Sequence, residues 1–298
     1  MKPTGPIPAG WEILNGELSV DGRTATQIVD EEGQTPLFVY SRERLDRQYS
    51  RLRAAMPERL AIHYAVKANP FVPVLRHMAG LVDGFDIASG GELDILEGAG
   101  IDPTLVSFAG PGKRDAELEA AIRHGVTLNT EGEAEVERAL AIGKRLGITP
   151  RLAIRVNPSF ELKGSGMKMG GGAKPFGVDA DRVPALAARI AKSGAEFRGL
   201  HIYAGSQSLD ADALIEAQGN TLDLAARLVG EAGVGLPHLN MGGGFGIPYF
   251  AGDEPLDVER IGAALAERFA RLPGELADTQ FAIELGRYLV GEAGVYLT

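Results

Sequence analysis

Eight short apolar runs, separated by helical patterns and turns, are the feature that most constrains what this sequence can fold into. The runs lie at residues 62–68, 84–89, 105–110, 125–130, 151–157, 199–205, 238–244 and 281–287. Short apolar runs that alternate with amphipathic helical patterns are typical of βα units around a parallel sheet. Because eight such units close a barrel, the sequence predicts an α/β fold built on a (β/α)₈ TIM barrel.

The first 36 residues lack this pattern and are interrupted by proline and glycine. Asn15-Gly16 stands between two possible strands and is a signal for a β-hairpin turn. We therefore expect a small N-terminal β segment at residues 1–36, outside the barrel.

Composition argues against several kinds of partner and site. The net charge is −10 and no stripe of lysine or arginine is present, so we expect no nucleic-acid or anionic membrane surface. No stretch approaches the ~18 apolar residues of a membrane span, and the sequence starts without a signal peptide. Without cysteine there is no disulfide, thiolate metal site or cysteine nucleophile, and we expect a cytoplasmic protein.

The histidines give no sign of a metal site. Neither an HxH nor an HExxH spacing occurs. His63 and His201 lie within apolar runs, where a packed and hydrogen-bonded side chain is the ordinary outcome. We therefore expect no bound metal.

Polar residues and glycines gather where the apolar runs end. The carboxyl ends of barrel strands all face one mouth, so these side chains should converge on one cavity. The candidate site residues are Lys67, Asp86, Arg155, Tyr203, Ser206, Gly243, Gly244, Glu284, Gly286 and Arg287.

Each candidate also has an ordinary structural interpretation. Lys67 can be a solvated charge, and the glycine run "MGGGFG" can be a flexible turn. Glu284 can be the ion-pair partner of Arg287, and Asp86 can be the N-cap of the helix that follows it.

A lysine, a phosphate-binding cup and a carboxylate at one mouth fit pyridoxal 5'-phosphate. The cofactor aldehyde needs a lysine amine, which Lys67 offers. Closely spaced backbone N–H groups of the glycine run, with Ser206 and Arg287, suit the phosphate. Glu284 near the ring nitrogen would favour the protonated ring, which accepts electrons when a bond at the substrate Cα breaks.

Five motifs in order carry a resemblance that covers nearly the whole chain: "HYAVKANP", "GFDIASGGEL", "GLHIYAGSQ", "MGGGFG" and "ELGRYLV". They resemble the successive motifs of the fold-type III pyridoxal-phosphate decarboxylases, the group that contains diaminopimelate, ornithine and arginine decarboxylases. The resemblance implies that Lys67 bonds the cofactor, that Asp86 lies near it, and that Glu284 meets the ring nitrogen. It places Ser206, Gly243, Gly244 and Arg287 at the phosphate.

Two positions depart from the family pattern. Tyr203 stands where these decarboxylases usually have a histidine that stacks on the cofactor ring. Tyrosine can also stack, but it offers no group that titrates near neutral pH. Leu285 replaces a common proline.

The stretch from Lys163 to Asp179 is most similar to decarboxylases associated with exosortase A systems, which resemble the butirosin-pathway enzyme that acts on a glutamyl carrier protein. Residues 163–174 contain five glycines and three lysines. We expect a mobile loop over the barrel mouth that selects an acidic or carrier-linked substrate, or a solvated connection without that role.

Members of this family continue into a β domain built from both termini, which brings a cysteine and an aspartate into the neighbouring subunit's site. The resemblance therefore implies a homodimer with shared active sites. It also implies three parts of the chain: the N-terminal β segment at 1–36, the pyridoxal-phosphate-binding barrel at 37–290, and the start of a C-terminal β domain, mostly missing, at 291–298.

The implied activity is α-decarboxylation of an amino acid or a carrier-linked aminoacyl group. Other interpretations stay open: a diaminopimelate decarboxylase of the lysine pathway, an alanine racemase-like enzyme, or a non-catalytic pyridoxal-phosphate-binding protein. Racemases of this type usually place an arginine at the ring nitrogen, which Glu284 argues against. A catalytically dead regulator resembling antizyme inhibitor would most simply have lost Lys67, which is present.

Overall fold

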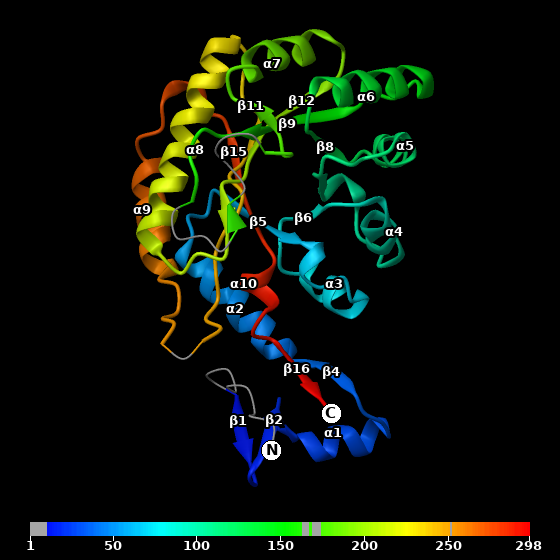
Figure 1. Ribbon diagram of the computed structural model, residues 1–298, viewed down its shortest axis with the longest axis vertical. Coiled ribbons are helices and arrows are strands. Elements are labelled where there is room, and N and C mark those ends of the chain that lie inside the picture. Colours follow the sequence, from blue (N-terminus) through cyan, green and yellow to red (C-terminus); the bar gives the residue numbers. More distant parts are fainter. Residues whose placement is uncertain (1–10, 163–166, 169–173, 251) are drawn as a thin grey trace.

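Eight parallel strands form a closed barrel in the computed structural model, which describes residues 11–162, 167–168, 174–250 and 252–298 (Figure 1). The strands are β5 (Leu60–Ala65), β6 (Gly84–Ile87), β7 (Val106–Phe108), β8 (Thr127–Thr130), β9 (Arg151–Asn157), β12 (Glu196–Ile202), β14 (His238–Asn240) and β15 (Gln280–Leu285). Each pairs in parallel with the next, and β15 pairs with β5 to close the ring. The predicted (β/α)₈ barrel is confirmed.

Every predicted apolar run contains a strand, but six of the eight strands end before their runs do, and two of these ends, the first and the seventh, shape the site. The first becomes a 3₁₀ turn, η1 (Val66–Ala68), so Lys67 lies just beyond β5 rather than on it. The seventh stops at Asn240 because Gly242 and Gly244 adopt φ angles of 69° and 92°, in the left-handed region that breaks strand pairing. Both departures occur at the carboxyl ends of strands.

Helices surround the barrel and bury one face each against it (Figure 1). They are α2 (Arg42–Ala55), α3 (Val72–Met78), α4 (Gly90–Gly98), α5 (Asp115–Arg123), α6 (Glu133–Leu146), α7 (Val183–Lys192), α8 (Ala211–Ala232), α9 (Val258–Phe269) and α10 (Arg287–Val290). In α7, Val183, Leu186, Ala187 and Ile190 are buried, the spacing of an amphipathic helix.

The two ends of the described chain meet below the barrel (Figure 1). Strands β1 (Glu12–Leu14), β2 (Glu17–Val20) and β3 (Arg23–Thr24) form an antiparallel sheet beside α1 (Ala25–Glu32). The predicted hairpin is present, with left-handed φ angles at Asn15 and Gly16. Strand β4 (Leu37–Tyr40) pairs with β16 (Gly294–Leu297), and Trp11, Val20, Ile28 and Leu297 form a separate small core.

The remaining short elements are η2 (Pro103–Leu105), β10 (Met167–Lys168), β11 (Val178–Asp179), β13 (Gly205–Ser206) and η3 (Gly274–Leu276). Strand β10 pairs with β13, which carries Ser206. The rest of the loop predicted at 163–174 lies almost wholly outside the described residues. In the described ranges, no helix combines the length and apolarity needed to cross a membrane.

Candidate active site

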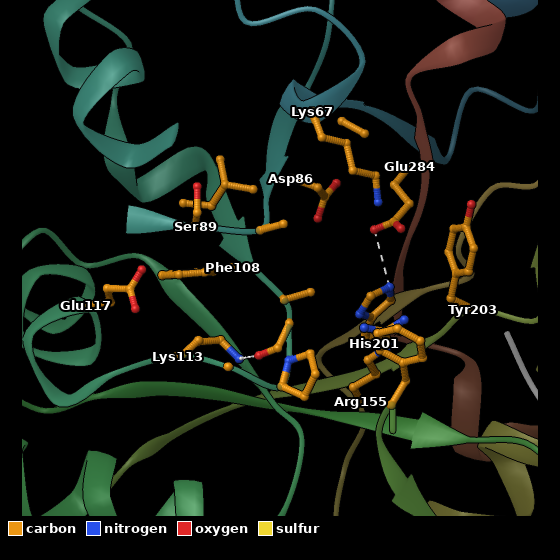
Figure 2. Close-up of a pocket in the computed structure, with 18 of the residues that line it drawn as sticks. Lys67, Asp86, Ser89, Phe108, Lys113, Glu117, Arg155, His201, Tyr203 and Glu284 are labelled. Atoms are coloured by element: carbon orange, nitrogen blue, oxygen red, sulfur yellow. Dashed lines mark hydrogen bonds and ion pairs between the residues drawn. The ribbon is translucent and has the colours of Figure 1, made fainter. Parts of the chain in front are cut away.

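Two adjoining cavities open at the carboxyl ends of the barrel strands. The first has a volume of about 530 Å³ and the second of about 520 Å³; Lys67, Tyr203 and Glu284 border both. We call the first the aspartate lobe and the second the glycine lobe. The aspartate lobe is also lined by Asp86, Ser89, Phe108, Arg155 and His201 (Figure 2), and the glycine lobe by Ser206, Gly244, Gly286 and Arg287.

Lys67 projects from η1 to the boundary between the two lobes. Its Nζ lies 5.9 Å from the centroid of the Tyr203 ring. Figure 2 shows its amine directed toward Glu284. Within the described part of the chain, no hydrogen bond or ion pair engages this amine, so it is available to a reaction partner in either lobe.

Glu284, near the end of β15, is a buried carboxylate that remains ionised. Its Oε2 accepts a hydrogen bond from Asn240 Nδ2 at 3.1 Å and lies 3.2 Å from His201 Nε2. Burial alone would raise the pKa of Glu284, but the charge and contact of His201, with Lys67 further away, lower it to about 2. No ion pair joins Glu284 to Arg287 in the described ranges, so that structural alternative is wrong.

His201 is buried, as the sequence predicted, and its Nε2 lies 3.2 Å from Glu284 Oε2. Its side chain is only 2% exposed, and neither ring nitrogen has a well-aligned hydrogen-bond partner among the described residues. A buried polar group of this kind is costly unless something else satisfies it. Its ring borders the aspartate lobe, where a ligand could do so.

Asp86, on β6, is a buried residue in the wall of the same lobe. His63 Nδ1 lies 3.1 Å from Asp86 Oδ2. The predicted N-cap alternative for Asp86 is wrong, because the Ser89 side chain caps α4 by accepting a hydrogen bond from the backbone N–H of Glu92. Burial lowers the pKa of His63, but the charge and hydrogen bond of Asp86, together with the charges of Glu284 and Asp83, outweigh this effect and the net direction is upward.

Arg155 and Tyr203 form part of the wall of the aspartate lobe. Arg155 Nη1 donates to Glu131 Oε1 at 3.0 Å, and its guanidinium lies 4.8 Å from the ring centroid of Phe176. Burial, followed by the charge of Glu284, raises the pKa of Tyr203 to about 12. The phenol therefore stays neutral over the ordinary pH range.

In the glycine lobe, the structure separates two glycines that the sequence had treated alike. Gly244 lines the cavity in a left-handed conformation, whereas Gly243 lines neither lobe. A Cβ at Gly243 would lie 2.0 Å from the carbonyl oxygen of Glu284, so this glycine is needed where two strand ends approach closely. On the far side of the lobe, Arg287 Nη1 donates to the Tyr249 hydroxyl at 2.9 Å.

Sequence reasoning missed His201 in the wall of this site and two residues that support it from beneath, His63 and Asn240. His63 and His201 were expected to be packed and hydrogen-bonded side chains rather than metal ligands, and Asn240 was not singled out. Asn240 precedes the glycine run by one residue, a local signal that marks a strand end. Its contact with Glu284 crosses to the neighbouring strand, which no local pattern reveals.

The residues present fit pyridoxal phosphate. The site combines an unengaged lysine amine, a buried ionised carboxylate and an imidazole beside that carboxylate, next to a glycine-lined lobe with a serine and an arginine. These are the groups that an aldehyde, a pyridine nitrogen and a phosphate require. In the described part of the chain, no cluster of His, Asp or Glu is arranged to hold a metal ion.

The comparison with known families agrees with this donor set. The family model for the pyridoxal binding domain of pyridoxal-dependent decarboxylases matches residues 42–291. The chain belongs to this family.

Two similar curated proteins are decarboxylases with different substrates. The chain is 31% identical over 272 residues to an L-glutamyl-[BtrI acyl-carrier protein] decarboxylase from Niallia circulans, covering 89% of this chain and 63% of the relative. It is 38% identical to a diaminopimelate decarboxylase from Neisseria meningitidis, covering 89% of this chain and 64% of the relative. The chain thus spans just under two thirds of the length of these two curated relatives.

Solved structures of diaminopimelate decarboxylases share the fold of this chain. Diaminopimelate decarboxylase from M. jannaschii superposes with a TM-score of 0.86 at 27% identity, covering 96% of this chain and 68% of that chain. The enzyme from Helicobacter pylori, complexed with L-lysine, gives a TM-score of 0.82 at 29% identity, covering 91% and 68%.

Proposed function

We propose that the protein is a pyridoxal-phosphate-dependent carboxy-lyase that removes the α-carboxylate of an amino acid or of a carrier-linked aminoacyl group. Two kinds of relative support this range of substrates, because one acts on a glutamyl carrier protein and the other is a diaminopimelate decarboxylase. The lysine-pathway reaction and the exosortase-associated one are both contained in this proposal.

The observation that carries the proposal is the pairing of an available amine with a permanently ionised carboxylate in one cavity. Lys67 has no partner in the described part of the chain, and the pKa of Glu284 is lowered to about 2. A racemase-type site would not need a carboxylate at this position, so Glu284 favours decarboxylation.

In this proposal, each lobe binds one part of the cofactor. Lys67 would hold the cofactor through its aldehyde group, and Ser206, Gly244, Gly286 and Arg287 would hold its phosphate. Gly243 acts indirectly, by letting the glycine run approach β15. When bound, pyridoxal phosphate supplies the electron sink for the pair of electrons left behind as CO₂ departs.

The polar groups of the aspartate lobe then have separate tasks. Glu284 holds a proton at the ring nitrogen, because its carboxylate stays ionised at any pH at which the enzyme would work. The neutral Tyr203 ring offers a face on which the cofactor can stack without competing for that proton. Asp86 holds the imidazole of His63 beneath the lobe, and the guanidinium of Arg155 is held in place by Glu131.

A cytoplasmic location and a homodimer with shared active sites belong to the same proposal, as do the domain limits at residues 36 and 290. The absence of cysteine supports the first, and the family resemblance supports the others.

Carbon dioxide release tests the proposal directly. The protein, loaded with pyridoxal phosphate, is incubated with diaminopimelate, lysine, ornithine, arginine, glutamate and glutamyl-carrier protein. We expect CO₂ from at least one member of this panel and an amine product of matching mass. Racemisation without CO₂ would contradict the proposal and favour the racemase interpretation.

A further inference from the structure

Five polar side chains form a continuous line across the interior of the barrel. The line runs from His63 to Asp86 (3.1 Å), to Asn240 (3.4 Å), to Glu284 (3.1 Å) and to His201 (3.2 Å). These residues come from five segments that are far apart in the sequence. Asn240 is the central member and the only amide among them.

Asn240 lies beneath the active site rather than within it. It borders neither the aspartate lobe nor the glycine lobe. Together with His63 it lines a separate cavity of about 480 Å³ near the amino ends of the strands, which we call the amino-end cavity. A residue in this position can act on the reacting groups only through its neighbours.

The orientation of the Asn240 amide follows from its contacts. Its Oδ1 accepts a hydrogen bond from the backbone N–H of Gly242 at 2.9 Å. The Nδ2 group must therefore face the other way, where both neighbours are carboxylates that can only accept. Its two hydrogens suit one carboxylate each, Asp86 Oδ1 and Glu284 Oε2.

Asp86 and Glu284 are two buried carboxylates that approach the Asn240 amide from both sides. Two carboxylates so placed would ordinarily not both ionise. Asp86 is 6% exposed and Glu284 is 8% exposed. Like charges at close range raise the pKa of one member of a pair, and burial adds to this effect. The charges of His201, Lys67 and Arg155 favour the ionised form of Glu284, and the hydrogen bond that Asn240 donates to the same carboxylate adds to their effect.

We propose that Asn240 is a positioning residue that holds the Glu284 carboxylate toward the cavity and keeps it ionised beside Asp86. Its importance for catalysis rests on the proposed function, but its action on Glu284 does not. The first measurement is therefore made without cofactor and substrate, so that failure of this inference and failure of the proposed function are distinguishable.

The first experiment follows the Glu284 carboxyl group by ¹³C NMR in cofactor-free protein labelled at the glutamate side-chain carboxyl carbon. The Glu284 signal is assigned by its loss in Glu284→Gln. The test variant is Asn240→Asp, which keeps the shape, removes the donor and adds a third carboxylate. The matched control is Asn129→Asp, at a buried amide that lines the same amino-end cavity but donates to Ser107 instead of a carboxylate.

In the wild type and in Asn129→Asp, the Glu284 signal should remain at its ionised position to the lowest pH at which the protein is folded. In Asn240→Asp it should titrate, with a midpoint at least one pH unit higher, which is a tenfold change in the ionisation constant. A Glu284 signal in folded Asn240→Asp that matches the control over the whole range would overturn the inference. If Asn240→Asp does not fold, Asn240→Ser removes the amide without adding charge, and it should shift the midpoint in the same direction.

The second experiment separates positioning from a merely structural role. Because the glycine lobe is untouched, Asn240→Asp should bind pyridoxal phosphate within about threefold of the wild-type affinity while kcat falls at least tenfold. Asn129→Asp should retain both values. Loss of cofactor affinity in Asn240→Asp that matches the loss of kcat would show that the residue only supports the fold of the site. If the wild type releases no CO₂ from any substrate, the NMR result still decides the inference.

Discussion

The two ends of the barrel contain cavities of similar volume that differ in how their cations are engaged. At the amino end, Arg151 Nη1 donates to the carbonyl oxygens of Thr104 and Gly125, and Arg198 Nη1 donates to Glu196 at 2.8 Å. At the carboxyl end, Arg155 and Arg287 are engaged in the same way, but Lys67 has no such partner in the described ranges. Both cavities are lined by polar residues, so volume and polarity alone do not separate them.

The comparison teaches that an unengaged charge is a better marker of chemistry than a cavity. The arginines at the amino end are held by backbone carbonyls and a carboxylate, as expected where a barrel end mainly supports the fold. Lys67 remains accessible, and the adjoining Glu284 is kept ionised despite burial by the charges of His201 and Lys67. We therefore expect chemistry at the carboxyl end and effects on stability at the amino end.

The largest effect should come from removing the unengaged amine. Lys67→Ala should abolish the visible absorbance of the lysine-bound cofactor and all turnover, because no other described lysine borders both lobes. The matched change at the other end, Arg198→Ala, should keep both. An unaltered absorbance band in Lys67→Ala would break the comparison.

The next largest effect concerns the carboxylate at the ring nitrogen. Glu284→Gln keeps the shape of the side chain but removes its charge, so kcat should fall about 10²–10³-fold. Cofactor affinity should change little, because the glycine lobe is intact. Stopped-flow absorbance and equilibrium titration measure the two quantities separately, and wild-type turnover would show that ring protonation does not depend on Glu284.

A stability effect is expected at the amino end. Burial, followed by the charges of Arg198 and Arg151, lowers the pKa of His238 to about 4. Since the folded-state pKa lies below the unfolded value of about 6.5, the unfolded state binds the proton first as the pH falls. The stabilisation is complete above about pH 6.5 and is lost as the pH falls toward 4.

His238→Gln should therefore reduce the drop in unfolding free energy between pH 7 and pH 5 by up to about 2 kcal/mol. Urea unfolding at the two pH values measures this difference. His124→Gln, at an exposed histidine that pairs with Glu97, is the control and should show no such reduction. Equal acid sensitivity of His238→Gln and the wild type would remove the assigned role of His238.

The smallest effect is expected for the loop that the sequence places over the barrel mouth. Changing Lys163, Lys168 and Lys174 to serine should lower kcat/KM several-fold on an acidic or carrier-linked substrate, with a loss that shrinks as salt rises. The cofactor absorbance should not change. Unaltered kinetics over the substrate panel would leave the loop as a connection without a role in selection.

Much of the fold could be predicted from local patterns. Each apolar run contains a strand, as a short apolar pattern predicts for a buried sheet. The parallel arrangement follows from the helices between the runs. The hairpin at Asn15-Gly16 was also readable, since only a few residues accept its left-handed backbone. The pairing of β4 with β16 was not, because it joins segments more than 250 residues apart.

For the site, the sequence identified the residues that point into the mouth but not the groups that support them. Lys67 and Glu284 could be predicted as site residues because each lies near the end of an apolar run. The contacts of His63 with Asp86 and of Asn240 with Glu284 depend on the register between neighbouring strands, which the sequence pattern leaves open. The roles assigned to these residues stay predictions until they are measured.

Borohydride reduction followed by peptide mapping tests the central claim, that the carboxyl-end site carries the cofactor on Lys67, most directly. The protein is loaded with pyridoxal phosphate, reduced, digested and analysed by mass spectrometry. We predict a single stoichiometric phosphopyridoxyl adduct on the peptide that contains "HYAVKANP", at Lys67, and none at Lys113 in the same lobe. An adduct at another lysine, or no adduct at saturating cofactor, would contradict the account.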